Sequence, residues 1–172
     1  MSATSPAAQD DAAEPRYGER EDRALALWIV LSRAASAVTA HSAADIARSE
    51  LTPAEFAVLE LLYHKGPQLL GEVQKKVLVS SGGVTYIVDR LADRGLLERR
   101  LCPSDRRARY AAITRKGKAL MKQVFPRHAE AIRAAVAGLS EEEQVQARAL
   151  LRKLGRAAAA AAAMGPKAVR EP

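Results

Sequence analysis

The chain has 172 residues, a net charge of +7 and a pI of about 9.9, and its length suits one domain with or without an oligomerisation arm. Aromatic residues are scarce and alanine is plentiful, which favours helices over an all-β fold. The single cysteine excludes an intramolecular disulfide framework, and no stretch reads as a membrane span or an apolar signal core, so we expect a cytoplasmic protein with no membrane partner.

The positive charge is concentrated in the middle third of the chain. Residues 71–127 carry 14 Lys and Arg against 5 Asp and Glu, whereas residues 1–70 carry 6 against 10. A basic segment in an otherwise balanced chain is typical of a nucleic-acid-binding face. Charge alone is equally compatible with a solvated basic surface. Only the sequence motifs can distinguish this from a nucleic-acid-binding face.

The first predicted element is a long amphipathic helix from about Glu21 to Ser49, preceded by a small, polar tail, residues 1–18, that we expect to be disordered. Neither Pro nor Gly interrupts the helix, and apolar residues such as Leu27 and Leu31 recur at three- and four-residue spacing. At 1.5 Å per residue it would be about 40 Å long, more than a small domain needs. Part of it is therefore expected to meet another element or chain.

The second predicted helix has unusually complete start signals. Thr52 is a good N-cap, Pro53 suits the first helical position, and Glu55 completes a capping box with Thr52. The helix is expected to run to about His64 and to stop before Gly66.

Two shorter helices follow, joined by a tight turn. The first has Leu70, Val73 and Val77 on its inward face. The second is expected to begin at Ser80 or Ser81 and to end at Gly95, because glycine readily adopts the left-handed conformation that ends helices. The second helix is small and polar at its start, and its apolar face consists of Val84, Ile87, Val88 and Leu91. This arrangement predicts a helix-turn-helix.

A basic β-hairpin is predicted next. Residues 96–100 and 109–113 read as two short strands, and Pro103, Ser104 and Asp105 between them favour a turn. The fold class predicted from these elements is mainly α with a small β-hairpin wing, a winged helix-turn-helix.

Two further helices complete the chain. Thr114 is a plausible N-cap for a helix to about Ala137, which Pro126 should bend. Ser140 and Glu143 form a second capping box, which opens a helix to about Ala163.

Residues 51–118 resemble the MarR family of bacterial transcriptional regulators. The most specific element is the wing, because Asp105, Arg107, Ile113, Thr114 and Gly117 match the family pattern D-x-R…[LI]-T-x-x-G. The LYHKGP and CPSDRR segments are most similar to the branch that regulates resistance to catechols and quinones. The resemblance covers roughly residues 20–155 and implies a homodimer that binds a pseudo-palindrome in double-stranded DNA.

With this resemblance the chain is divided into five parts. They are a disordered tail (1–18), an N-terminal dimerisation helix (19–50), the winged helix-turn-helix (51–114), C-terminal dimerisation helices (115–163) and a flexible tail (164–172). The helical dimerisation domain is implied by the resemblance and agrees with terminal helices that are too long for one small domain.

The resemblance places Arg107 in the DNA minor groove, where narrow A·T-rich grooves concentrate negative potential. Asp105 would hold its guanidinium by a charge-assisted hydrogen bond, and Arg106 and Arg109 are expected to meet phosphates. The alternative for this run is a solvated hairpin. The other expected DNA contacts are Gln74, Lys75, Lys76, Ser80, Ser81, Gly82, Gly83, Thr85, Tyr86 and Arg90. Gly82 and Gly83 either ease the turn or let the backbone approach DNA closely.

A small aromatic or phenolic effector is implied by the family, in a pocket where the first, second and fifth helices meet the winged domain. The residues expected to line it are Trp28, Ser32, Phe56, Leu59, Tyr63 and His64, although core or dimer packing is the alternative for the apolar ones. His41 and His128 are expected at the surface or at an interface.

The sequence also bears on three other function classes. Cys102 lies among arginines that favour its thiolate, so a redox-sensing regulator on the same fold is one alternative. A winged-helix module used only for protein contacts is another. An enzyme is not expected, because no nucleophile elbow, phosphate loop or acid–base pair is recognisable, and neither a metal site nor a cofactor is indicated.

Overall fold

The computed structural model describes residues 18–77, 81–102 and 105–165, and within these the side chains of Ser81, Cys102 and residues 105–108 lie outside the description. The chain divides between Ala37 and Val38 into two compact units. Helix α1, Glu19–Ala47, begins in the first unit and ends in the second.

The part of α1 in the first unit has a largely exposed apolar surface. Its side chains at Leu27, Trp28 and Val30 are 58%, 64% and 65% exposed. By length and composition alone α1 could also cross a membrane, so the expectation that no stretch has this character is wrong. A core helix of a soluble protein or a signal sequence can have the same length and composition, and Arg33 lies within the apolar stretch.

Helix α2, Pro53–Lys65, begins and ends as its sequence predicts. The Thr52 hydroxyl accepts the N–H of Glu55, and the Glu55 carboxylate accepts the N–H of Thr52, so both halves of the capping box are present. Gly66, with φ of 72°, donates its N–H to the Leu62 carbonyl and closes the helix. Its buried face, which includes Phe56, Leu59 and Leu62, faces the core.

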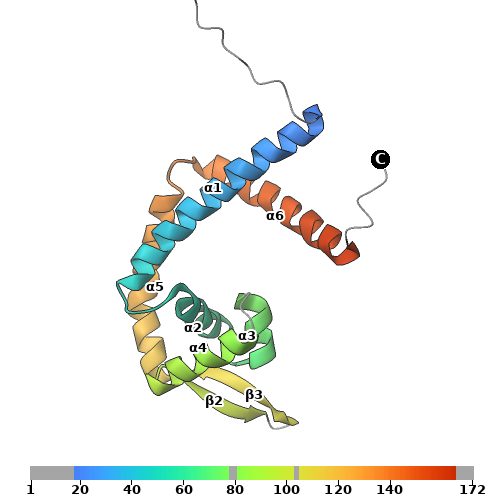
Figure 1. Ribbon diagram of the computed structural model, residues 1–172. Coiled ribbons are helices and arrows are strands. Elements are labelled where there is room, and N and C mark those ends of the chain that lie inside the picture. The colour runs from blue at the N-terminus through green and yellow to red at the C-terminus, as the bar shows by residue number, and fades with distance from the viewer. Residues whose placement is uncertain (1–17, 78–80, 103–104, 166–172) are drawn as a thin grey trace, which may run out of the picture. The chain divides into compact units, whose positions relative to one another are not determined.

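The wing is a three-stranded antiparallel sheet in the order β1-β3-β2. Strands β2, Leu97–Cys102, and β3, Asp105–Ile113, form the predicted hairpin, which projects beyond the helices (Figure 1). Strand β1, Gln68–Leu69, pairs with Ala111 and Tyr110 of β3. The predicted hairpin is therefore present, but the sheet also has a third strand that the sequence did not predict. A strand of two residues is too short to show the alternating pattern by which strands are recognised.

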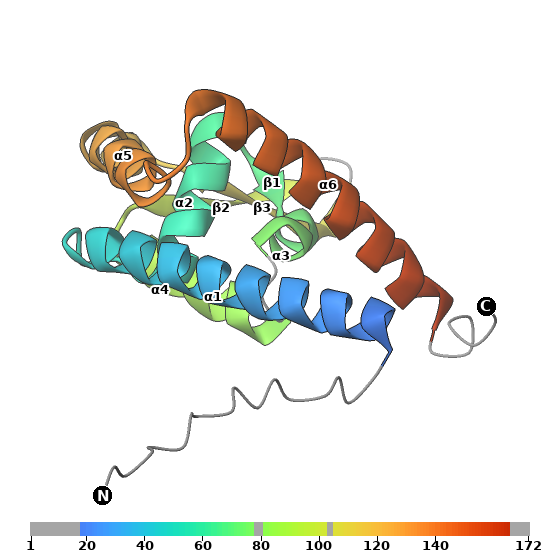
Figure 2. The same ribbon diagram turned by 90° about the horizontal axis from the view of Figure 1, so that it is seen from above.

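Helices α3, Leu70–Val77, and α4, Ser81–Asp93, pack with α2 beside this sheet (Figure 2). Val73 of α3 is fully buried, whereas Leu70 and Val77 are half-buried. The predicted apolar face of α4 is confirmed, since all four of its residues are buried: Val84, Ile87, Val88 and Leu91. With Leu97, Ala111 and Ile113 of the sheet they belong to one hydrophobic core.

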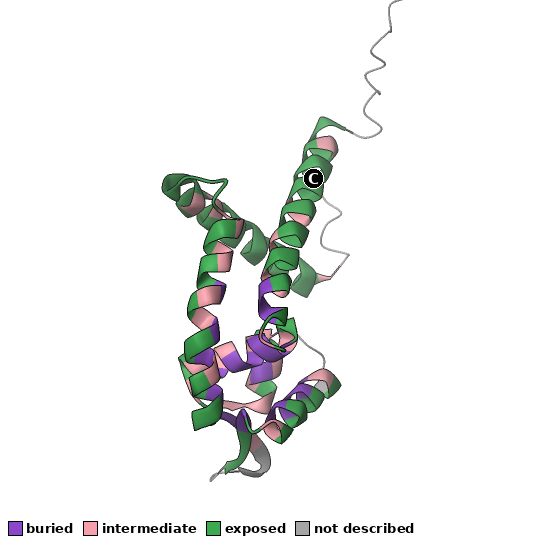
Figure 3. Ribbon diagram, turned by 90° about the vertical axis from the view of Figure 1, so that its left-hand side faces the viewer, coloured by how far each residue is buried: buried purple, intermediate pink, exposed green. Residues whose placement is uncertain are grey.

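The two C-terminal helices differ sharply in burial. Helix α5, Arg115–Ala135, is capped by Thr114 as predicted and packs Met121 and Val124 into the core. Helix α6, Glu141–Met164, is capped by Ser140 as predicted but has no buried residue. Figure 3 shows buried residues gathered in the winged helix-turn-helix and α5, whereas α6 is mainly exposed.

Candidate nucleic-acid interface

The exposed face of α4 carries the side chains expected to read DNA. Thr85, Tyr86 and Arg90 are exposed there, on the opposite side from the core residues. Ser80 and the side chain of Ser81 lie outside the described residues. The described part of α4 thus has the two faces that a recognition helix needs, one buried and one open.

No contact with the described residues requires a glycine at position 82. It is exposed, its φ is not positive, and a Cβ built there would meet no atom within 4 Å. Gly83 is half-buried. Steric fit in the described residues therefore does not require glycine at position 82, which leaves close approach of DNA and ease of forming the turn as the two interpretations.

The lysines of α3 are exposed, and each contacts a polar side chain. Lys75 Nζ lies 3.1 Å from Glu72 Oε1, and Lys76 Nζ donates to Gln68 Oε1 at 2.6 Å. Gln74 is half-buried on the same helix. Such exposed contacts are weak, so both ammonium groups are free to exchange them for phosphate oxygens.

The wing tip holds the residues with the strongest sequence signal. Residues 103–104 and the side chains of Cys102, Asp105, Arg106 and Arg107 lie outside the description, so the arginine, its expected brace and the redox alternative at Cys102 stay predictions. The backbone pairs Cys102 with Asp105 and Leu101 with Arg109, with an irregularity in register between Leu101 and Cys102. Arg99 on β2 binds Asp89 of α4 at 2.6 Å, which ties the wing to the recognition helix.

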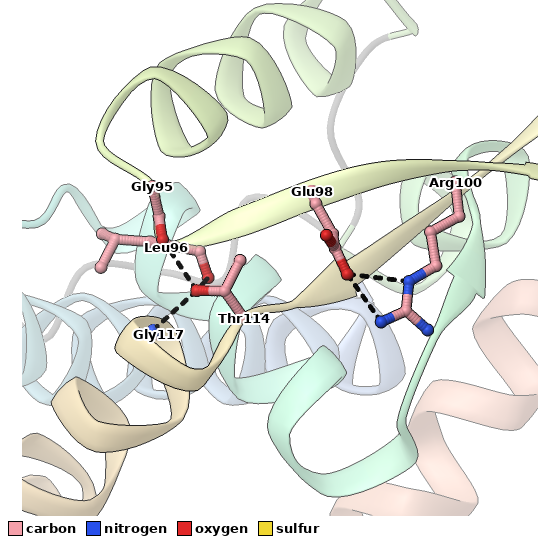
Figure 4. A network of polar contacts seen from close by, with 6 residues as sticks. All are labelled: Gly95, Leu96, Glu98, Arg100, Thr114 and Gly117. Carbon is pink, nitrogen blue, oxygen red and sulfur yellow. Dashed lines mark hydrogen bonds and ion pairs between the residues drawn. The ribbon is translucent and has the colours of Figure 1, made fainter.

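The base of the wing explains why the family pattern contains Thr and Gly. The Thr114 hydroxyl donates toward the carbonyls of Gly95 and Leu96, at 2.7 and 3.1 Å, and accepts the N–H of Gly117 (Figure 4). Gly95, at φ of 68°, is the turn that ends α4. Thr114 therefore fastens the end of α4 to the start of α5.

A buried carboxylate lies behind the exposed face of α4. Glu55 is 1% exposed, and its Oε1 is 3.2 Å from Arg90 Nε and 3.8 Å from Arg94 Nη1. A hydrogen bond with Tyr86, and next the charge of Glu55, raise the pKa of Arg90 above its ordinary value. Sequence reasoning identified Glu55 as a capping residue but missed these contacts, because the partners are 35 and 39 positions away.

The six residues expected to bind an effector occupy different environments. Phe56 and Leu59 lie in the hydrophobic core, Tyr63 is half-buried beside it, and His64 is exposed with its ring 4.6 Å from that of Phe125. Trp28 and Ser32 belong to the first unit, where Trp28 is exposed and Ser32 is half-buried. His64 also lines a hollow of about 350 Å³ whose other lining residues are Ala57, Glu60, Leu61, Lys65, Lys76 and Val77.

The two histidines expected at a surface or interface differ. His41 is exposed, but His128 is 8% exposed and packs its ring against Phe56 at 4.5 Å. Its Nδ1 is 3.3 Å from Asp45 Oδ2, and Arg127 Nε donates to Asp45 Oδ1 at 2.9 Å. The surface expectation for His128 is wrong within the described chain, because a buried acid from α1 gives its polar ring a partner. The described residues contain no cluster of three or more His, Cys, Asp or Glu able to hold a metal ion.

Comparison with known proteins identifies what kind of protein carries this site. The MarR family model matches residues 51–108. The HTH-type transcriptional regulator MhqR of Bacillus subtilis is 45% identical over 134 residues, which cover 78% of this chain and 92% of MhqR. The chain belongs to the MarR family. It is a DNA-binding transcriptional regulator with a winged helix-turn-helix fold, as predicted, and regulators of this family act as dimers.

Two solved structures are especially informative for a MarR-family chain. BpsR of Bordetella bronchiseptica, described for regulation of its DNA binding by 6-hydroxynicotinic acid, is 33% identical, with a TM-score of 0.68 over 75% of this chain and 98% of BpsR. Sco3205 of Streptomyces coelicolor, a MarR family regulator solved in complex with DNA, is 25% identical, with a TM-score of 0.73 over 84% of this chain and 92% of Sco3205.

Proposed function

We propose that this chain is a cytoplasmic homodimeric repressor that leaves a pseudo-palindromic operator when a small aromatic or phenolic molecule binds. The observation that carries the proposal is the pairing of a basic helix-turn-helix and wing with terminal helices whose apolar residues are exposed. The first feature supports DNA binding, and the second supports a second copy of the chain.

The case for a homodimer rests on helices α1 and α6. Val145, Leu150 and Leu151 of α6 are 70%, 67% and 50% exposed, and α6 contributes nothing to the core. A helix with several large apolar side chains exposed and none buried is a candidate for an interface with another chain. In a family that acts as dimers, the occupant that fits is a second copy, and two recognition helices about 34 Å apart would then meet successive turns of one DNA face.

The wing arginine gives the sharpest prediction about DNA. We expect Arg107→Ala to weaken operator binding about tenfold and to flatten the salt dependence by about one phosphate-equivalent. The measurement is a gel-shift series across salt concentrations, with Arg48→Ala, an exposed arginine in the turn directly after α1, as the matched control. An Arg107 variant that binds like the wild type at every salt concentration would remove Arg107 from the interface.

The case for an effector rests on the hollow beside His64. Its volume of about 350 Å³ suits a small aromatic ring, and apolar Ala57, Leu61 and Val77 line it with polar Glu60 and His64. Lys76, one of the residues expected to contact DNA, lines the same hollow. A ligand there could therefore compete for a DNA-contacting side chain. BpsR, whose DNA binding is regulated by a hydroxylated aromatic acid, supports this class of effector.

One experiment tests the proposed function as a whole. The protein is incubated with DNA from upstream of its own gene, and the mass of the complex is measured by light scattering, with two protomers per duplex expected. A panel of hydroxylated aromatic acids, catechols and quinones is then screened by thermal shift, because a ligand that binds the native state raises its melting temperature. A compound that stabilises the wild type but not His64→Ala, and that releases the DNA, supports the proposal. Release by oxidants that is lost in Cys102→Ser would favour the redox alternative instead.

A further inference from the structure

The buried carboxylate of Glu55 does more than a helix cap requires. One oxygen, Oε2, accepts the N–H of Thr52 at 2.8 Å and completes the capping box of α2. A glutamine fills this role as well as a glutamate, because the cap needs only an acceptor. The negative charge and the second oxygen therefore need another explanation.

The second oxygen faces Arg90 of the recognition helix and Arg94, which directly follows that helix. Glu55 Oε1 is 3.2 Å from Arg90 Nε and 3.8 Å from Arg94 Nη1, yet it accepts no hydrogen bond of ordinary geometry within the described residues. The contact is thus an ion pair that depends on charge. Arg90 and Arg94 are four residues apart on neighbouring turns, so their charges repel and the carboxylate between them offsets that repulsion. In return, the two guanidinium groups compensate the cost of burying a carboxylate that is 2% exposed.

The pair leaves Arg90 at the surface in a defined position. Its side chain is 45% exposed, and its Cζ lies 5.8 Å from the centre of the Tyr86 ring. Arg94 is held more deeply, since its Nη1 donates to the carbonyl of Glu50 at 3.0 Å and its own carbonyl accepts from Lys116 Nζ at 2.7 Å. Arg90 is consequently the member of this cluster that is both fixed from behind and open to DNA.

We propose that Glu55 is a positioning residue for DNA reading: its charge holds Arg90 in place on the recognition helix and thereby raises the preference for operator over non-specific DNA. A buried negative charge cannot help attraction to phosphate in general. Its benefit comes from ordering a flexible side chain before DNA arrives, which favours the one geometry that the operator offers. The inference rests on the proposed contact between Arg90 and DNA.

The chain supplies a matched pair of variants for the test. Glu55→Gln and Glu143→Gln both change the third helical residue of a capping box, and Glu143 accepts the N–H of Ser140 at the same distance of 2.8 Å. Among the described residues Glu143 takes part in no ion pair with an arginine or lysine. Glu143→Gln therefore controls for the loss of a capping charge.

The readout is the ratio of affinities for two kinds of DNA. The specific duplex is enriched by the wild-type protein from a random-sequence pool, and the non-specific duplex is unselected. We expect Glu55→Gln to lower the ratio about tenfold, mainly through weaker operator binding, and Glu143→Gln to leave it unchanged. Equal ratios for Glu55→Gln and the wild type would overturn the inference.

A double-mutant cycle separates this inference from the proposed function. If Glu55 acts through Arg90, the effect of Glu55→Gln should largely disappear in an Arg90→Ala background. Full additivity would overturn the inference, as would an unchanged ratio in Arg90→Ala. Failure to enrich any duplex would instead contradict the proposed function as a repressor of a specific operator.

A measurement on the unaltered protein covers the case in which Glu55→Gln does not fold. In DNA-free protein the Arg90 Nε–H group should be ordered on the ps–ns timescale by NMR relaxation, whereas that of the exposed Arg48 should be mobile. Equal mobility of the two side chains would contradict the positioning role.

Discussion

Replacing Gly117 with alanine is expected to lower the free energy of unfolding by about 3 kcal/mol, the upper part of the range for overpacking a tightly filled site. A Cβ at this position would lie 2.0 Å from the Leu96 carbonyl oxygen and 2.7 Å from Ile113 Cγ1. The nearest obstacle is backbone, so a change of rotamer cannot relieve it. Urea unfolding followed by circular dichroism measures the change.

The Leu96 carbonyl cannot easily move away from such a methyl group. It accepts both the backbone N–H and the hydroxyl of Thr114, each at 3.1 Å, and the same hydroxyl caps α5 through Gly117 N–H. Gly71→Ala is the control, since a Cβ on this α3 glycine meets nothing within 4 Å and should be neutral or stabilising by up to about 1 kcal/mol. Similar stabilities for the two variants would show that this junction is not tightly packed.

Local signals in the sequence were sufficient for most of the secondary structure. The caps at Thr52, Thr114 and Ser140 were predicted because each satisfies backbone N–H groups within three residues along the chain. The buried face of α4 was predicted from apolar spacing for the same reason, because the whole pattern lies within about two helical turns. Short-range geometry thus accounts for the order and ends of the helices.

Contacts between distant residues were not predictable in this way. Glu55 gave a complete local explanation as a capping residue, so nothing in the sequence pointed to Arg90. His128 lies 83 positions from its partner Asp45, and its burial depends on how α5 packs against the end of α1. Strand β1 has only two residues and exists because β3 offers it an edge. In each case a partner that is distant in the sequence determines what the residue or strand does. The local sequence pattern does not specify that partner.

The role of Gly117 was predictable from the sequence only in part. The family pattern marked it as a required residue, but the pattern gives no physical reason for glycine. The structure supplies the reason, because α5 begins directly against the backbone that leads from α4 into β2. The wing and the recognition helix are thus fixed to each other at one junction, and a change there should alter both parts of the DNA face together.

A second large effect is expected at Arg127, which pairs with the buried Asp45. Arg127 Nε donates to Asp45 Oδ1 at 2.9 Å, and its Nη2 donates to the Ser49 hydroxyl at 2.6 Å. Asp45 is 7% exposed. In Arg127→Ala its remaining side-chain partner among the described residues would be the ring of His128. We expect a loss of about 2 kcal/mol in unfolding free energy, less than for a fully buried pair because Arg127 is 39% exposed.

The control lies on the same helix. Arg133 pairs with Glu130, but both side chains are exposed, at 71% and 62%, so Arg133→Ala should change the unfolding free energy far less than Arg127→Ala does. Urea unfolding of both variants makes the comparison, and equal losses would mean that the Asp45 pair contributes no more than a surface contact.

Adding Asp45→Asn to Arg127→Ala separates the two possible origins of the loss. If the cost comes from a buried charge without compensation, neutralising Asp45 should recover part of it, so the double variant should be more stable than Arg127→Ala alone. If the cost came only from lost packing of the arginine stem, the second change would recover nothing. The sign of that difference therefore decides whether charge or contact holds the end of α1 against α5.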